Sequence, residues 1–201
     1  MDGGGFSTAV FGGKMTARDV LADVARIAEG EDLYNAIKTQ TDRTDENVKK
    51  CLDVLFMCYK NVIKDIALNY YEFVAQATIN SNSLYLRSLP LPAIKIISLK
   101  DKNGKEITDA KLDGDYLRVS QTPYFLVYRT IPNVLSVTST HPFENTVIGS
   151  NIVVYGTLAE YCLVNSRFEE ALSWESKYRQ SLDFISDNKS RKMKAGKVWG
   201  L

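Results

Sequence analysis

Residues 152–187 have the sequence IVVYGTLAEYCLVNSRFEEALSWESKYRQSLDFISD. Apolar side chains recur at helical spacing on both sides of Asn165 and Ser166, which predicts two helices, over residues 152–163 and 167–186, joined by a tight turn. The segment Ser166-Arg167-Phe168-Glu169 matches a capping box, so we expect Ser166 to be the N-cap of the second helix.

The helical spacing also predicts which side chains of this hairpin face its core. Gly156 and Ala159 are small, which would let the helices approach closely. The residues expected to point inward are Tyr155, Leu158, Ala159 and Cys162 on the first helix, and Phe168, Ala171, Leu172, Tyr178, Leu182 and Ile185 on the second.

The N-terminal part of the chain predicts the helices that this hairpin packs against. Thr16 and Asp19 resemble a capping box, and Gly30 would end the helix that they start. Its apolar face would consist of Val20, Leu21, Val24, Ile27 and Ala28. A short helix over residues 32–40 would turn Leu33, Tyr34 and Ile37 inward. Thr44 or Asp45 would cap a longer helix, whose apolar seam comprises Val48, Leu52, Leu55, Tyr59, Val62 and Ile66.

The middle of the chain changes from helical spacing to short strands and turns. Leu89-Pro90-Leu91-Pro92 forms a rigid corner, and residues 94–99 form a strand. Asn103-Gly104 marks the turn that follows, and Glu106-Ile107-Thr108 begins the return strand. Asp113-Gly114-Asp115 marks another turn, and residues 116–119 and 124–128 are expected to pair with each other. This pattern fits a small antiparallel barrel or sandwich-like insert, followed by a loop over residues 137–149.

The chain is therefore expected to have an α+β fold: an α-helical bundle of about four helices with an inserted small antiparallel β domain and an extended C-terminal tail. The glycine-rich residues 1–14 would form a flexible N-terminal arm. The other expected segments are the N-terminal helices of the bundle (15–72), the β insertion and loop (73–150), the C-terminal hairpin (151–187) and a basic docking tail (188–201).

Composition restricts the class of protein. The 201 residues carry a net charge of +1, so nucleic-acid binding driven by overall charge is not indicated. No apolar stretch approaches the roughly 20 residues that a membrane span needs, and the N-terminus does not resemble a signal peptide. Cys51, Cys58 and Cys162 are an odd number of cysteines beside apolar residues, which indicates reduced, buried thiols made in a cytoplasm.

The sequence does not display a catalytic constellation, so we expect neither an enzyme nor a metal or cofactor site. His141 has no adjacent nucleophile, and the Asp113-Gly114-Asp115 segment lacks the remaining ligands of a calcium loop. The glycine clusters do not precede a Gly-Lys-Ser/Thr signature, so a phosphate-binding loop is not expected. An unfamiliar enzyme would at least require Asp113, Asp115 and His141 to gather around a deep pocket.

The segment after Asn188 has five cations, no acidic residue and apolar side chains, among them Met193, Val198 and Trp199, that it cannot bury by itself. Docking into an acidic and apolar groove on another protein would use both features. Contact with nucleic acid and a free solvated tail are the competing interpretations. The residues assigned to docking are Lys189, Arg191, Lys192, Met193, Lys194, Lys197, Val198 and Trp199.

The C-terminal part of the chain combines the segments Tyr155-Gly156-Thr157-Leu158-Ala159-Glu160-Tyr161, Asn165-Ser166-Arg167-Phe168-Glu169-Glu170-Ala171, Trp174, Tyr178, Lys192-Met193-Lys194 and Lys197-Val198-Trp199. This pattern resembles that of the head–tail connector (adaptor) proteins of tailed bacteriophages. The arrangement of helices, β insertion, helix pair and basic tail is similar over residues 15–201, whereas the motifs cover residues 152–201.

This resemblance implies a structural virion protein without enzymatic activity. It would form a homo-oligomeric ring, usually a dodecamer, in the neck at the capsid vertex, after synthesis in the bacterial cytoplasm. Its tail would dock on the portal protein, and the other side of the ring would meet a downstream tail or neck protein. Genomic DNA would pass through the central ejection channel without sequence-specific contact. No membrane contact is implied.

An alternative is a helical-hairpin protein-interaction module with a non-viral role. Leu158, Tyr161, Phe168 and Ala171 also resemble one tetratricopeptide unit. About three such units are needed to bury their faces by stacking, and here a β segment interrupts the chain.

Overall fold

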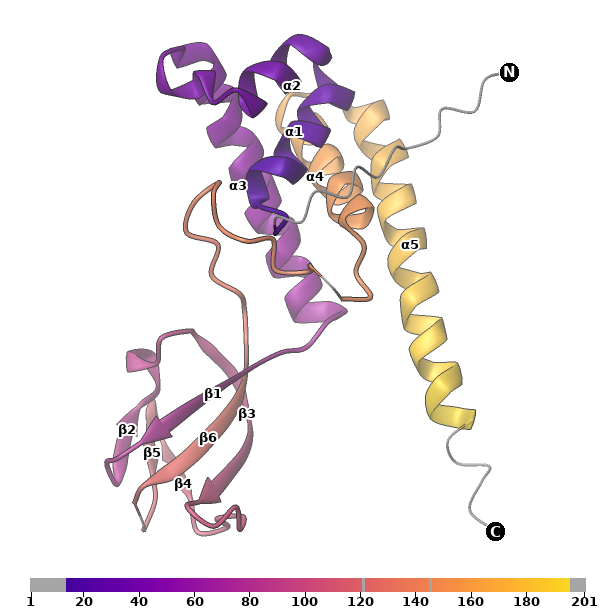
Figure 1. The fold of residues 1–201 in the computed structure, drawn as a ribbon. Coiled ribbons are helices and arrows are strands. Elements are labelled where there is room, and N and C mark those ends of the chain that lie inside the picture. The colour runs from indigo at the N-terminus through magenta and orange to yellow at the C-terminus, as the bar shows by residue number, and fades with distance from the viewer. Residues whose placement is uncertain (1–13, 121, 145, 196–201) are drawn as a thin grey trace.

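The computed structural model describes residues 14–120, 122–144 and 146–195, with side chains up to residue 186 (Figure 1). Helices and strands combine in an α+β fold, which confirms the predicted fold class. None of the described helices is long and apolar enough to cross a membrane. The elements are α1 (Ala17–Ala28), α2 (Glu31–Lys38), α3 (Glu46–Asn69), β1 (Phe73–Ile79), β2 (Ser83–Tyr85), β3 (Ala93–Asp101), β4 (Lys111–Asp113), β5 (Tyr116–Arg118), β6 (Tyr124–Thr130), α4 (Ser150–Val164) and α5 (Phe168–Ala195).

Helices α1 and α3 start where their capping residues predict. The Thr16 hydroxyl accepts a hydrogen bond from the Asp19 backbone, and the Asp19 carboxylate accepts one from the Thr16 backbone, so the capping box is confirmed. Asp45 caps α3 by accepting hydrogen bonds from Asn47 and Val48. The prediction that Ile27 faces the core is wrong, because its side chain is 42% exposed.

The bundle core joins α1, α3 and α4 around fully buried side chains. Leu21, Leu55, Tyr59, Ile63 and Leu158 belong to one apolar cluster. The predicted seam of α3 is thus confirmed as core, with Val48 at its partly buried end. Near the bundle's edge, the Arg18 guanidinium forms an ion pair with Asp42 at 2.7 Å and donates to the Ile37 carbonyl, which ties α1 to α2 and to the segment after it.

Gly156 is where α4 passes closest to its neighbours. A Cβ atom at this position would lie 2.8 Å from Val62 Cγ1 of α3 and 3.0 Å from the Tyr178 ring of α5. The Tyr178 hydroxyl donates to Asp65 of α3 at 2.8 Å, so α5 and α3 are joined across α4. The predicted role of Gly156 in close packing is confirmed, and the missing side chain is what allows three helices to meet.

The β insertion contains two antiparallel three-stranded sheets, with strand orders β1-β6-β3 and β2-β5-β4. Leu126 of β6 lies opposite Ala77 and Leu99, and Leu117 of β5 lies opposite Leu84 and Leu112. Apolar residues of both sheets form one cluster, which matches the predicted sandwich-like insert.

Two details of the predicted strand pairing are wrong. The segments around β5 and β6 do not pair with each other, because β5 lies between β2 and β4 while β6 lies between β1 and β3. The strand expected to return after Asn103-Gly104 is reduced to one bridge between Lys100 and Glu106. The turn itself forms, with Gly104 at a φ of 80°.

The junction between bundle and β insertion is both polar and aromatic. Arg129 of β6 donates to the carbonyls of Ala67 and Leu68 at the end of α3, where the helix leaves acceptors without internal partners. Aromatic rings are also in contact, from Tyr59 of α3 through His141 and Phe143 to Tyr71 and Phe73.

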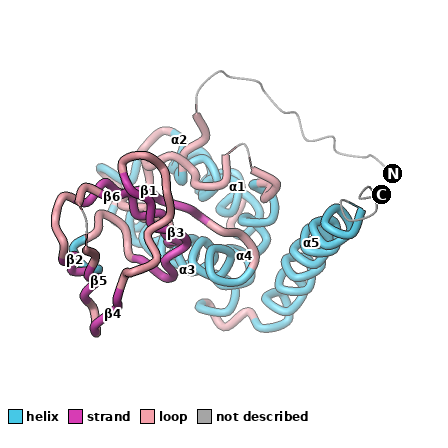
Figure 2. The backbone as a smooth tube through the Cα atoms, turned by 90° about the horizontal axis from the view of Figure 1, so that it is seen from below, coloured by secondary structure: helices cyan, strands magenta, loops and turns pink. Residues whose placement is uncertain are grey.

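Figures 1 and 2 show how the remaining parts lie around the bundle. The β insertion and the C-terminal end of α5 project from the same end of the bundle, with α5 on the side away from the strands. The loop before α4 returns to α1, where Ser139 and Val137 carbonyls accept hydrogen bonds from the Ala17 and Arg18 backbone. The ends of the β insertion are therefore fixed to the start and the end of the N-terminal helices.

We predict that Gly156→Val lowers the free energy of unfolding by about 1–3 kcal/mol, because the added methyl groups enter space occupied by Val62 and Tyr178. Urea denaturation of the variant measures the loss. Ser173→Val on the exposed face of α5 is the matched control, since it introduces the same β-branched side chain without a clash. Equal stability of the two variants would contradict the close contact at Gly156.

We further predict that the protein loses stability between about pH 6.5 and pH 4 as His141 titrates. Burial lowers the pKa of His141 from 6.5 to about 4, so the unfolded chain binds a proton in this range that the folded chain does not. The loss is on the order of 3 kcal/mol. Thermal melts across this range measure it, with His141→Gln as the non-titrating control. The same slope in the control would contradict the assignment to His141.

Candidate partner interface on the C-terminal helical hairpin

The turn between α4 and α5 differs from the predicted capping box. Ser166 has a φ of 60°, and α5 begins at Phe168. The Ser166 backbone N–H donates to the Leu163 carbonyl, and the Arg167 N–H donates to the Cys162 carbonyl at 2.8 Å. These two bonds form a Schellman motif at the end of α4, with Ser166 as its left-handed residue. Ser166 therefore ends the first helix of the hairpin rather than capping the second.

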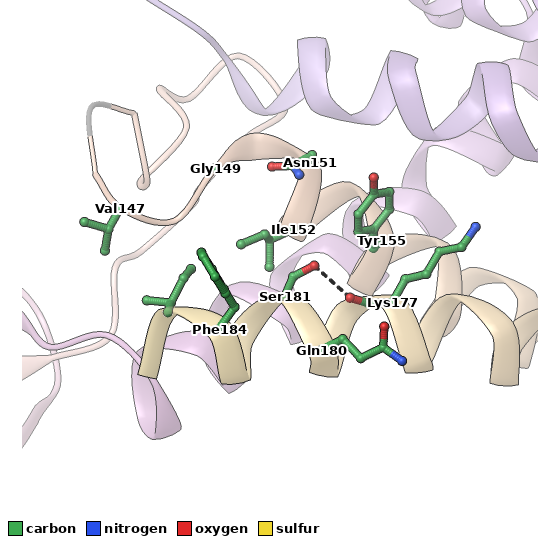
Figure 3. Close-up of a pocket in the computed structure, with 10 residues that line it drawn as sticks. Val147, Gly149, Asn151, Ile152, Tyr155, Lys177, Gln180, Ser181 and Phe184 are labelled. Atoms are coloured by element: carbon green, nitrogen blue, oxygen red, sulfur yellow. Dashed lines mark hydrogen bonds between the residues drawn. The ribbon is translucent and has the colours of Figure 1, made fainter. Parts of the chain in front are cut away.

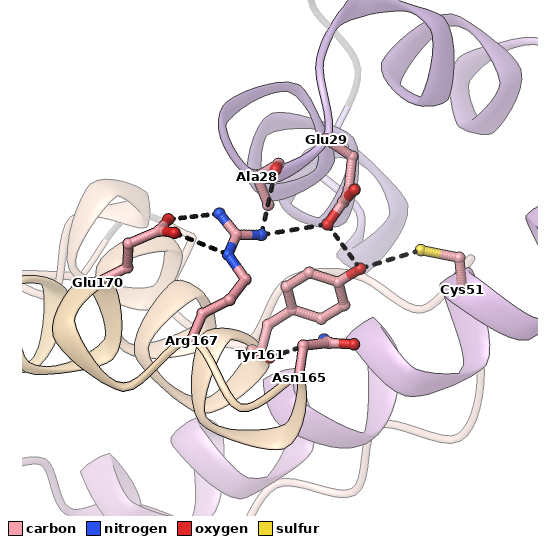
Figure 4. A network of polar contacts seen from close by, with 7 residues as sticks. All are labelled: Ala28, Glu29, Cys51, Tyr161, Asn165, Arg167 and Glu170. Carbon is pink, nitrogen blue, oxygen red and sulfur yellow. Dashed lines mark hydrogen bonds and ion pairs between the residues drawn. The ribbon is translucent and has the colours of Figure 1, made fainter.

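Arg167 fixes this turn to α1. Its Nη1 lies 3.3 Å from the Ala28 carbonyl and 3.2 Å from Glu29 Oε1, and its Nε donates to Glu170 at 2.9 Å (Figure 4). The guanidinium lowers the pKa of the Glu170 carboxyl through these hydrogen bonds. A cation at the carboxyl end of α1 also interacts favourably with the helix dipole.

Tyr161 continues the network to α3. Its hydroxyl donates to Glu29 Oε1 at 3.1 Å and lies 3.5 Å from the Cys51 sulfur (Figure 4). Burial raises the pKa of both the Tyr161 hydroxyl and the Cys51 thiol, so both stay protonated at neutral pH. All three cysteines are free thiols; Cys58 and Cys162 are buried and Cys51 is half-buried. The network holds the turn end of the hairpin against two other helices.

One side of the hairpin near this turn carries exposed apolar side chains, which we name the proximal flank: Leu163, Phe168 and Leu172. They are 53%, 60% and 72% exposed. They line a groove of about 390 Å³ together with Ala159, Glu160, Ala171, Glu175 and Arg179. The prediction that Phe168 and Leu172 face the core is wrong. Residues follow each other at about 100° around a helix, and Leu172 lies one step past the buried Ala171.

A second set of exposed apolar side chains lies further along α5, and we name Val147 and Phe184 the distal flank. They are 61% and 70% exposed. They face each other across a groove of about 570 Å³ between the start of α4 and α5, with Ile152 at its base (Figure 3). Lys177 and Gln180 form the end of the groove nearer the turn.

The two flanks lie on opposite sides of α5. At about 100° per residue, Phe184 is about 160° around the axis from Phe168. The buried row of Ala171, Tyr178 and Leu182 faces α4 between them. The sequence contains a signal for the distal flank, because Phe184 does not fall on this row, whereas Val147 lies in a loop where no period identifies it.

The predicted docking tail falls largely outside the described side chains. The helix ends at Ala195 instead of residue 186, so the backbone at Lys189, Arg191, Lys192, Met193 and Lys194 is helical. The side chains of these five residues are outside the described part. Lys197, Val198 and Trp199 lie wholly outside the described residues.

The residues that an enzyme would need to bring together are separated. His141 is buried in the bundle, where its Nδ1 lies 2.8 Å from the Tyr59 hydroxyl. Asp113 and Asp115 flank the β4–β5 turn and form ion pairs with Arg118 and Arg87. Within the described ranges, no group of three or more histidine, cysteine or acidic side chains is placed to hold a metal ion.

Comparison with known proteins finds no matching family model, and no curated protein matches the chain.

We predict that Ser166→Gly raises the free energy of unfolding by about 1 kcal/mol, because glycine adopts the left-handed conformation without a steric cost. Chemical denaturation measures the change. Ser173→Gly in the exposed part of α5 is the matched control and should destabilise by about 0.5 kcal/mol. A loss of stability in Ser166→Gly would instead support a capping role for the Ser166 hydroxyl.

Proposed function

We propose that this chain is a structural virion protein of a tailed bacteriophage, a head–tail connector whose copies form a ring between the portal and the tail. The observation that carries the proposal is the pair of exposed apolar flanks on a rigidly held hairpin. Exposed apolar patches of this kind are typical of surfaces that other proteins cover. The hairpin is also the part of the sequence that resembles connector proteins.

The arrangement of the chain supports a role between two different partners. The β insertion and the end of α5 project from one end of the bundle, so both can reach neighbours that the bundle itself does not contact (Figure 1). The basic segment begins on α5, which carries it away from the bundle core. In this proposal that segment docks on the portal protein, and the β insertion lies at the ring's edge or meets a downstream tail or neck protein.

The ring would enclose the DNA without recognising its sequence. Genomic DNA would pass through its centre during packaging and ejection, with steric and electrostatic contact only. The protein would need no reaction chemistry for this role, since its work is to join two assemblies and leave a channel open.

We predict that removing residues 189–201 leaves the bundle folded but abolishes portal binding. The described bundle core lies entirely before this segment, so circular dichroism and thermal melting should change little. Pull-down with the portal protein of the same genome, followed by electron microscopy, measures docking. Trp199→Ala alone should weaken binding about tenfold or more, as expected of an aromatic anchor.

The matched control replaces the five cations of the segment with glutamine and keeps the apolar side chains. It separates the contribution of charge, which should fall with added salt, from that of the anchor. Undiminished docking of the truncated chain would remove the role assigned to the segment. A chain that stays monomeric and ignores the portal would contradict the connector proposal and favour a separate interaction module.

A further inference from the structure

The two flanks of α5 differ in charge as well as in position. The groove of the proximal flank includes Glu160, which has no ion-pair partner among the described side chains. The other acid in that groove, Glu175, is paired with Arg179 at 2.6 Å. An unpaired carboxylate therefore borders the apolar side chains of this flank.

The distal flank has the opposite charge. Its groove includes Lys177, whose ammonium lies 4.0 Å from the centre of the Trp174 ring and forms no ion pair with a described carboxylate. The lining of this groove contains no acidic residue. Each flank thus combines apolar side chains with one unpaired charge, and the two charges are complementary.

We infer that the proximal flank of one copy packs against the distal flank of the next copy of this chain. The inference rests on the proposed function, because it identifies the surfaces through which subunits of the ring meet. Phe168 and Leu172 would cover the exposed Val147 and Phe184 of the neighbour. Glu160 would approach Lys177 in the neighbour's distal groove. Both apolar flanks lose their contact with water in this arrangement.

A two-fold dimer fits these surfaces less well. Contact of two proximal flanks would bring Glu160 of one copy toward Glu160 of the other and leave both distal flanks exposed. A head-to-tail contact uses different surfaces on the two partners, and repeated copies close into a ring when the rotation permits. The position of the flanks on opposite sides of α5 supplies this geometry.

The test uses one disrupting variant for each flank, Leu172→Asp and Phe184→Asp. Both side chains are at least 70% exposed, so the fold should be retained, which thermal melting verifies. Each variant should weaken self-association about 30-fold or more. Leu135→Asp is the matched control, because Leu135 is 79% exposed in a loop outside both flanks and should leave assembly unchanged. Native mass spectrometry measures assembly, for the free protein and with the portal protein present.

Mixing the two variants gives the sharpest result. Phe184→Asp keeps an intact proximal flank and Leu172→Asp keeps an intact distal flank, so the mixture should form a heterodimer that neither variant forms alone and that grows no further. Larger mixed assemblies, or none, would overturn the head-to-tail contact. Assembly of wild type that neither variant impairs would overturn the flank assignment alone, whereas a wild type that never assembles would overturn the proposed function as well.

Discussion

The contact at Gly156 is the constraint on which the rest of the structure depends. Because α4 has no side chain there, Val62 of α3 and the Tyr178 ring of α5 reach its backbone. Tyr178 then donates to Asp65 on α3, so a polar bond and close packing act at the same point. A side chain at this position would force Val62 or the Tyr178 ring to shift, and so disturb the packing that positions α5.

The hairpin is held rigidly because it is fixed at two separate points, the turn and the middle. Arg167 and Tyr161 hold the turn end to α1 and α3 through Glu29 and Cys51. The middle is held at Gly156, and α5 continues beyond the bundle to Ala195. A helix fixed in this way presents its flanks in one defined orientation, which a closed ring of many copies requires because small angular errors accumulate around it.

Local signals predicted much of this structure. Thr16 and Asp45 identified two helix starts, and the spacing of apolar residues identified the core face of α3. The turn at Ser166 was harder, because a serine followed three residues later by glutamate fits a capping box as well as a left-handed helix end, and only the backbone bonds decide between them. The partner of each strand could not be predicted from local sequence. The strands β5 and β6 follow each other in the chain, yet they belong to different sheets.

The candidate interface could be predicted only in part, for a physical reason. An apolar residue beside a helical core row looks like core in sequence, and only packing shows that Phe168 and Leu172 lie outside it. The central claim is that this hairpin is an assembly element. Cryo-electron microscopy of the chain mixed with the portal protein proposed as its partner tests it most directly. The account predicts α5 between adjacent subunits, its proximal flank against the neighbour's distal flank; a ring joined through the β insertions with both flanks in solvent would contradict it.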